Sequence, residues 1–185
     1  MDVEIEWGGI TESIDNVALG TCFGFNFRRK GTQWALRVDE LFSTGETKKG
    51  LVSLTTGYED RSNGPAFFQL SAFGSNNIVY SMPDAKLALA TDQKHIYPGR
   101  YGIELEPRVI ARVGEQTLLI VAYNSGMRFV DVVSGTIAQN APNFDGPVLF
   151  SAWSIVRRQG DESKTIFEFP PPLPSPPLPS LSASP

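Results

Sequence analysis

Residues 117–123 read Thr-Leu-Leu-Ile-Val-Ala-Tyr, and this stretch decides the fold class. It is apolar on both faces, as expected of a central strand in a two-layer β core. The polar residues Asn124, Ser125 and Gly126 then form a turn signal that leads into a second strand-like run over 127–133. The centre of the sequence therefore predicts adjacent buried strands.

Alternation with a period of two residues recurs on both sides of this centre, and it is typical of strands with one buried face. The two clearest series are Phe23, Phe25 and Phe27, and, after a polar turn, Trp34, Leu36 and Val38. Further strand-like runs cover 51–56, 68–72, 78–80, 87–89, 109–113, 148–156 and 164–169. The rhythm amounts to about ten strands, which is typical of a sandwich or barrel.

Three local expectations follow from these runs. Residues 68–72 and 78–80 flank a Gly-Ser-Asn-Asn turn and predict a hairpin. Residues 148–156 form the longest apolar strand, and only 38–44 has a pattern compatible with a short helical turn. Because no long helices alternate with the strands, we do not expect a parallel α/β fold. We expect an all-β fold, specifically an antiparallel β-sandwich.

The composition fits one domain of ordinary size. The chain has 185 residues, of which 41% are hydrophobic, enough for a real core. Charged residues make up 19%, below the usual quarter. Neighbouring subunits that cover part of the surface would explain this, because interface cores are depleted in charge. A sandwich rich in serine, threonine, asparagine and glycine would explain it equally well.

The net charge and the N-terminal sequence argue against nucleic acid and membranes as main partners. The net charge of −4 argues against a surface dominated by nucleic-acid binding, and residues 1–7, which include three acidic and no basic residues, are not a basic RNA-binding arm. No signal-peptide pattern is present, and no apolar run approaches the ~18–20 residues that span a bilayer. We expect a cytoplasmic protein that does not bind a membrane.

The C-terminus differs in composition from the rest of the chain. Residues 171–175 (PPLPS) are repeated as 176–180, and eight of the 14 prolines lie in 170–185. Proline fixes φ and lacks the amide donor, so this segment cannot join a sheet and should be an extended polyproline II tail. We expect a β domain over 1–169, with an N-terminal extension over 1–17, and a tail that acts as a spacer, a groove ligand or a strap over a neighbouring subunit.

Nucleophilic and acid–base chemistry has few candidates. His95 is the only histidine and lies in a predicted loop, and no G-x-S-x-G motif is present, so we interpret it as a solvated side chain. Cys22 is the only cysteine and is surrounded by apolar residues, which predicts a buried thiol in the core.

Metal and phosphate sites are not predicted either. One histidine and one cysteine cannot form a zinc site, and no calcium-loop motif occurs. The acidic pairs Glu59-Asp60 and Asp161-Glu162 are interpreted as solvated turns. Gly8-Gly9 and Gly24 lack the phosphate-loop pattern. We therefore predict no catalytic, cofactor-binding or metal-binding residue, and no enzyme.

Basic residues form three short clusters at predicted strand ends. They are 28–30 (Arg-Arg-Lys), 48–49 (Lys-Lys) and 157–158 (Arg-Arg). If two of them shared one face they would contact phosphates, so weak binding of RNA is one hypothesis. The alternative is that they are solvated turn residues.

The strand rhythm over 20–158 and the closing Phe-Pro-Pro-Pro-Leu-Pro of residues 169–174 resemble the coat proteins of picorna-like viruses, especially the plant-infecting comovirus, nepovirus and cheravirus group. The resemblance is one of architecture rather than of motifs. It implies an eight-stranded jelly roll, other capsid subunits as partners and genomic RNA as cargo. It also implies a place in the virion and in the host cytoplasm, and no catalytic residues.

The rival hypothesis is a binding module, a lectin-like or receptor-binding β-sandwich. Trp7, Trp34 and Trp153 have side chains suited to stacking on sugars, although Trp34 and Trp153 occupy strand positions that predict core packing. The sequence therefore predicts a structural capsid subunit, with the binding module as the alternative.

Overall fold

The all-β prediction is confirmed by the computed structural model. The model describes residues 9–26, 32–41, 44–55, 66–72, 77–96, 107–123, 126–138, 146–159 and 161–169. Within these ranges there are fifteen strands, three short 3-10 helices and no α-helix. No described helix has the length and apolar character needed to cross a lipid bilayer.

The strands are β1 (Ile10–Ser13), β2 (Cys22–Asn26), β3 (Thr32–Leu41), β4 (Thr47–Ser53), β5 (Ala66–Gln69), β6 (Ile78–Met82), β7 (Ala85–Leu89), β8 (Lys94–Ile96), β9 (Ile110–Val113), β10 (Gln116–Tyr123), β11 (Gly126–Asp131), β12 (Thr136–Ala138), β13 (Val148–Phe150), β14 (Trp153–Gln159) and β15 (Glu162–Phe169). The 3-10 helices are η1 (Ile14–Asn16), η3 (Leu70–Ala72) and η4 (Thr91–Gln93).

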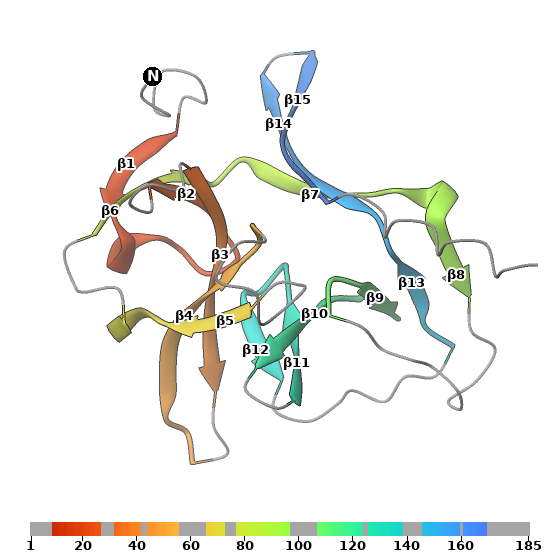
Figure 1. Cartoon of the computed structure of the whole chain (residues 1–185), viewed down its shortest axis with the longest axis horizontal. Coiled ribbons are helices and arrows are strands. Elements are labelled where there is room, and N and C mark those ends of the chain that lie inside the picture. The colour runs from red at the N-terminus through yellow and green to blue at the C-terminus, as the bar shows by residue number, and fades with distance from the viewer. Residues whose placement is uncertain are drawn as a thin grey trace, which may run out of the picture.

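The strands form two sheets (Figure 1). The larger has twelve strands and follows the order β1-β6-β2-β3-β12-β11-β10-β9-β13-β8, while β4 and β5 lie off this path. The smaller has the order β15-β14-β7. Strand β10 pairs with three others, which confirms that the run from Thr117 to Tyr123 is a central strand.

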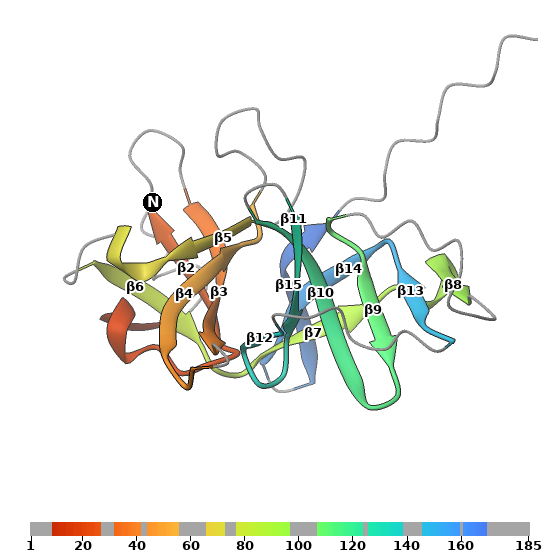
Figure 2. The same cartoon turned by 90° about the horizontal axis from the view of Figure 1, so that it is seen from below.

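Six strands of the large sheet close into a ring. From β3 the pairing runs through β4, β5, β10, β11 and β12 and returns to β3 (Figure 2). Two short parallel contacts complete the closure: Ala122 pairs with Ala66, and Ile137 pairs with Glu40. The sandwich was expected to be antiparallel throughout, and these two contacts are exceptions to that expectation.

The inside of the ring is an apolar core. Inward-facing side chains from alternate positions of its strands belong to one buried cluster: Leu36, Val38, Val52, Phe67, Leu119, Val121, Val130 and Ile137. Fully burying a side chain of this size contributes about 1.5–3 kcal/mol. The predicted period-two series Trp34, Leu36 and Val38 lies on this face, as expected.

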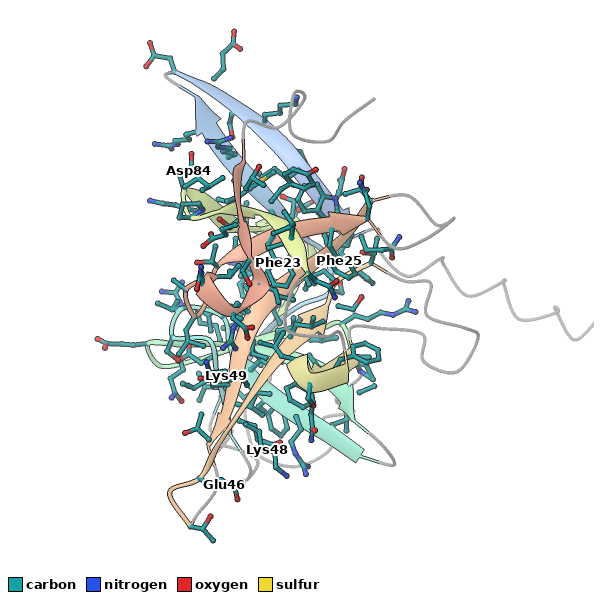
Figure 3. All side chains as sticks on the ribbon, turned by 90° about the vertical axis from the view of Figure 1, so that its left-hand side faces the viewer. Phe23, Phe25, Glu46, Lys48, Lys49 and Asp84 are labelled. Atoms are coloured by element: carbon teal, nitrogen blue, oxygen red, sulfur yellow. The ribbon has the colours of Figure 1, made fainter. Side chains whose placement is uncertain are left out.

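A second, smaller core covers the outer face of the ring. Phe23 is completely buried there, and its ring centroid lies 6.0 Å from that of Phe25 (Figure 3). Phe27, the third ring of the predicted series, lies outside the described residues. Ile14 and Val17 are buried in this core. Residues 10–17, predicted as an extension, therefore form β1 and η1 and pack against the body.

The small sheet packs against one end of the ring. Trp153, Ile155 and Ile166 share the buried cluster that fills the ring. The pairing of β14 with β15 shifts register between Ile155 and Val156, which marks a β-bulge. The bulge allows both Ile166 and Phe167 to contribute to the core.

Two local predictions are wrong because pairing partners distant in sequence decide the structure. Residues 38–41, predicted as part of a helical turn, continue β3, since they pair with β4 on one side and β12 on the other. The hairpin predicted for 68–72 and 78–80 does not form. Strand β5 pairs with β4 and β10, and β6 pairs with β1 and β2.

The apolar run 148–156 is not one strand. It divides at Ser151 and Ala152 into β13, in the large sheet, and β14, in the small sheet. The carbonyl of Ala152 accepts a hydrogen bond from the amide of Ala90 (3.1 Å) at this point. The strand predicted over 51–56 begins earlier, as β4 from Thr47. The tail, 170–185, lies outside the described residues.

Candidate functional site

An apolar pocket lies between the end of the ring and the small sheet. Its volume is about 420 Å³. Strands β3 and β10 contribute Leu36 and Leu119 from the ring, and β7 and β14 contribute Leu87 and Trp153 from the small sheet. This volume lies in the usual range of ligand pockets, about 300–1,000 Å³. Among the described residues that line it, Lys86 is the only charged one.

Trp153 forms the firmest part of the pocket wall. Its indole Nε1 donates a hydrogen bond to the carbonyl of Arg108 (2.8 Å), and its ring stacks on Phe169 with centroids 5.4 Å apart. The Arg108 guanidinium in turn lies 5.4 Å from the centroid of Phe169. These contacts fix the indole in a single orientation, because its polar and apolar parts are both held.

Arg108 has a backbone conformation that non-glycine residues rarely adopt, with φ of 98°. Its amide donates to the carbonyl of Ile120 (2.9 Å), while its own carbonyl accepts from Trp153. Strained backbone of this kind persists where surrounding contacts over-determine it, and it is found most often at functional sites. Here it supports the pocket wall.

The pocket opens to solvent beside exposed apolar residues. Val133 lines the pocket and is 77% exposed, and Lys86 on the facing sheet is also exposed. Leu19 is 42% exposed, and its neighbour Gly20 lies against the backbone of Val133. Val133 and Leu19 therefore form an apolar rim at the opening.

The described part of the pocket wall contains one thiol. Cys22 supplies it, but burial raises the pKa of this thiol from 9.0 to about 12, so the nucleophilic thiolate is scarce at neutral pH. This confirms the prediction that Cys22 is a core residue. The lining supports binding of an apolar group by burial of surface rather than chemistry on it.

The raised pKa of Cys22 predicts a specific alkaline destabilisation. Below pH 9 the thiol is neutral in both states. Between pH 9 and 12 only the unfolded chain releases the proton, so the free energy of unfolding falls by about 1.4 kcal/mol per pH unit. In urea titrations, the stability advantage of the wild type over Cys22→Ala should shrink by this amount above pH 9. A constant difference up to pH 11 would contradict the burial of Cys22.

The other candidates from the sequence do not converge on one site. His95 lies in β8 opposite Leu149 rather than in a loop, and its side chain is outside the described set. Asp161 and Glu162 are exposed at the β14–β15 turn, as predicted. Glu59, Asp60 and Gly8 lie outside the described residues. Within the described ranges, no three His, Cys, Asp or Glu side chains are grouped so as to hold a metal ion.

Within each basic doublet that lies on a strand, the two side chains point to opposite faces of the sheet. Successive residues of a strand point to opposite faces. Lys48 and Lys49 lie on β4 (Figure 3). Lys48 pairs with Glu40 of β3, and Lys49 pairs with Asp39. The cluster 28–30 lies outside the described residues. Binding of RNA through these clusters remains a prediction.

In the second described doublet, Arg157 and Arg158, one arginine forms an ion pair. Arg157 donates from Nε to Asp84 Oδ2 at 2.7 Å, and Arg158 follows it on the opposite face of β14. The pair is near the surface, since 46% of the Asp84 side chain is exposed. The Asp84 carboxylate therefore partly neutralises the charge of Arg157, which makes Arg157 less suited to binding a phosphate.

Buried charges lie on β3. The Arg37 side chain is 4% exposed, and its Nη1 donates to the Asp39 carboxylate (2.6 Å) and to the carbonyls of Val38 and Gly50. On the inner face, Glu40 lies 3.8 Å from Arg128. Because removing one partner of a buried pair leaves the other charge uncompensated, these groups are important for the stability of the ring.

The tryptophans do not offer a surface for sugars within the described part. Trp34 and Trp153 are both buried, which confirms the prediction that they pack in the core. Trp7 lies outside the described residues. Stacking of a carbohydrate on Trp34 or Trp153 would require the core to open.

No protein-family model, curated protein or solved structure matches this chain. The pocket was also not anticipated from the sequence. Its walls come from strands separated by more than a hundred residues, such as β3 and β14. The available signal was the alternation of Leu87 and Leu89, which predicts one apolar face but not the surface it covers.

Proposed function

We propose that this chain is a structural subunit of a viral shell, of the coat-protein class that its sequence resembles. In this proposal it acts by associating with copies of itself and with other β-rich subunits around an RNA genome. The low charged fraction of 19% supports it, because faces buried between subunits are depleted in charge. The finer fold, an eight-stranded jelly roll with an extended tail, is part of the same proposal.

The observation that carries the proposal is an edge strand of the large sheet that bears an exposed isoleucine. Strand β1 is the outermost strand of its order and pairs with β6. Ile10 on β1 is 55% exposed. Ile78 on β6 is 58% exposed as well, but it lies opposite Ser13, at the other end of the ladder and on the other face of the sheet. The outer side of an edge strand presents backbone amides and carbonyls with which a strand of another chain can pair.

The edge is firmly held, as a docking surface must be. Ser81 of β6 donates a hydrogen bond to the Glu12 carboxylate of β1. The amide of Ile14 donates to the carbonyl of Asn77 (3.0 Å), and Val79 is fully buried beneath the ladder. A preorganised edge loses little conformational freedom when a second subunit binds it.

The test compares the association of two charge-matched variants. Ile10→Lys/Thr11→Lys places charge on the exposed part of the edge strand, whereas Glu115→Gln/Gln116→Lys changes an exposed turn far along the sheet order. Each raises the formal net charge by two, from −4 to −2. By sedimentation velocity, the first should associate much more weakly than the wild type and the second should match it.

Circular dichroism should confirm that both variants stay folded, because exposed substitutions usually change stability by less than about 0.5 kcal/mol. Equal association of the two variants would show that the β1–β6 edge is not the contact. A wild type that does not associate at all would overturn the proposed function itself.

A further inference from the structure

We propose that the proline-rich tail, residues 170–185, docks in the apolar pocket of its own chain and fills it with leucine side chains of the tail. Docking of the tail does not require association between subunits.

The pocket needs an apolar occupant. Its lining is dominated by aliphatic side chains and Trp153, and Lys86 and Thr117 are its few polar members. Water in such a space finds too few hydrogen-bond partners, and apolar surface left open is unfavourable. The exposed rim residues Val133 and Leu19 extend this apolar surface beyond the opening.

The tail has the matching chemistry. It carries no charged side chain, and its apolar residues other than proline and alanine are Leu173, Leu178 and Leu181. Prolines restrict its conformations before binding, so little entropy is lost on docking, and aromatic-lined apolar grooves bind such segments. Leu178 and Leu181 are three residues apart, which places them on one face of a polyproline II helix.

The tail begins beside the pocket. Phe169 is the residue before it, pairs with Trp153 across β14 and β15, and stacks on the same indole that forms the pocket wall. At about 3.1 Å per residue, Leu173 lies within about 12 Å of Phe169 along the chain and Leu178 within about 28 Å. This tethering gives the leucines a high effective concentration at their own pocket.

Cys22 provides a direct test, since it lines the pocket and is the only cysteine. In the full chain, Leu178→Cys should place a second thiol in the pocket. Copper-phenanthroline oxidation followed by peptide mass mapping should then give an intramolecular disulfide between positions 22 and 178. The matched control is Ser180→Cys, because position 180 lies on another face of the polyproline helix. We expect several times more disulfide in the first variant.

Equal yields for the two variants, or no disulfide in either, would overturn the proposal. Disulfide-linked dimers as the main product would also overturn it, because they would place the tail in a neighbouring chain. Oxidation at a concentration where sedimentation shows monomers keeps this result independent of the assembly function.

A second measurement does not depend on introducing a thiol. In the full chain, Leu178→Ser/Leu181→Ser should increase the rate at which N-ethylmaleimide modifies Cys22 several-fold, because the pocket loses its occupant. Ser180→Ala/Ser182→Ala should react at the wild-type rate. Unchanged reactivity in the leucine variant would contradict docking.

Discussion

Gly135→Ala is expected to lower the free energy of unfolding by about 3–4 kcal/mol, because two penalties add at this position. Gly135 has φ of +69°, a region unfavourable to residues with a side chain. A Cβ atom there would lie 2.3 Å from the amide nitrogen of Gly20 and 2.9 Å from the carbonyl of Arg37. Urea denaturation measured by tryptophan fluorescence gives the difference.

The size of this effect follows from the position of Gly135 at a closure of the ring. Its carbonyl accepts from the amide of Asp39 (2.8 Å), directly before the parallel contact of β12 with β3. Gly114→Ala is the matched control, because Gly114 also has a positive φ of +59° but no described atom lies within 4 Å of a Cβ there. It should cost about 1–2 kcal/mol. Equal losses in both variants would argue against tight packing at this contact.

Arg37→Met is expected to destabilise the protein by about 3 kcal/mol, since it removes one member of a buried ion pair. The Arg37 guanidinium donates to the Asp39 carboxylate and also to the carbonyls of Val38 and Gly50. Replacing both charged residues, in Arg37→Met/Asp39→Leu, should cost less than the sum of the single changes. The difference between the summed losses of the single variants and the loss of the double variant is the interaction energy of the two side chains.

Arg157 and Asp84 supply the control, because they form an Arg–Asp pair of nearly the same length, 2.7 Å, nearer the surface. We expect an interaction energy below about 1 kcal/mol for this pair and a larger one for Arg37 with Asp39. Denaturation curves of both double-mutant cycles provide the two values. Equal energies would show that burial of Arg37 contributes nothing to the pair.

The sequence predicted local strand patterns well where one face of a strand is buried. The alternation of Trp34, Leu36 and Val38 and the apolar run of β10 both correspond to core strands. Alternation reports which side chains face inward, and burial of those side chains dominates the stability of such strands. The same reasoning correctly placed Cys22 in the core.

Local sequence patterns did not predict which strands pair with each other. Residues 148–156 are continuously apolar, yet they divide between two sheets, and 68–72 does not pair with 78–80. Closure of the ring depends on Ile137 meeting Glu40 and Ala122 meeting Ala66, contacts between residues far apart in the chain. Such contacts carry no periodic signal, so the ring and the pocket at its end could not be predicted.

In the proposed function this protein associates with copies of itself and with other subunits. Light scattering of the purified full chain, from dilute to concentrated solution, tests it most directly. We expect the mean mass to rise with concentration above the monomer value of 20.3 kDa. A mass that stays at the monomer value in the most concentrated solution would contradict the claim.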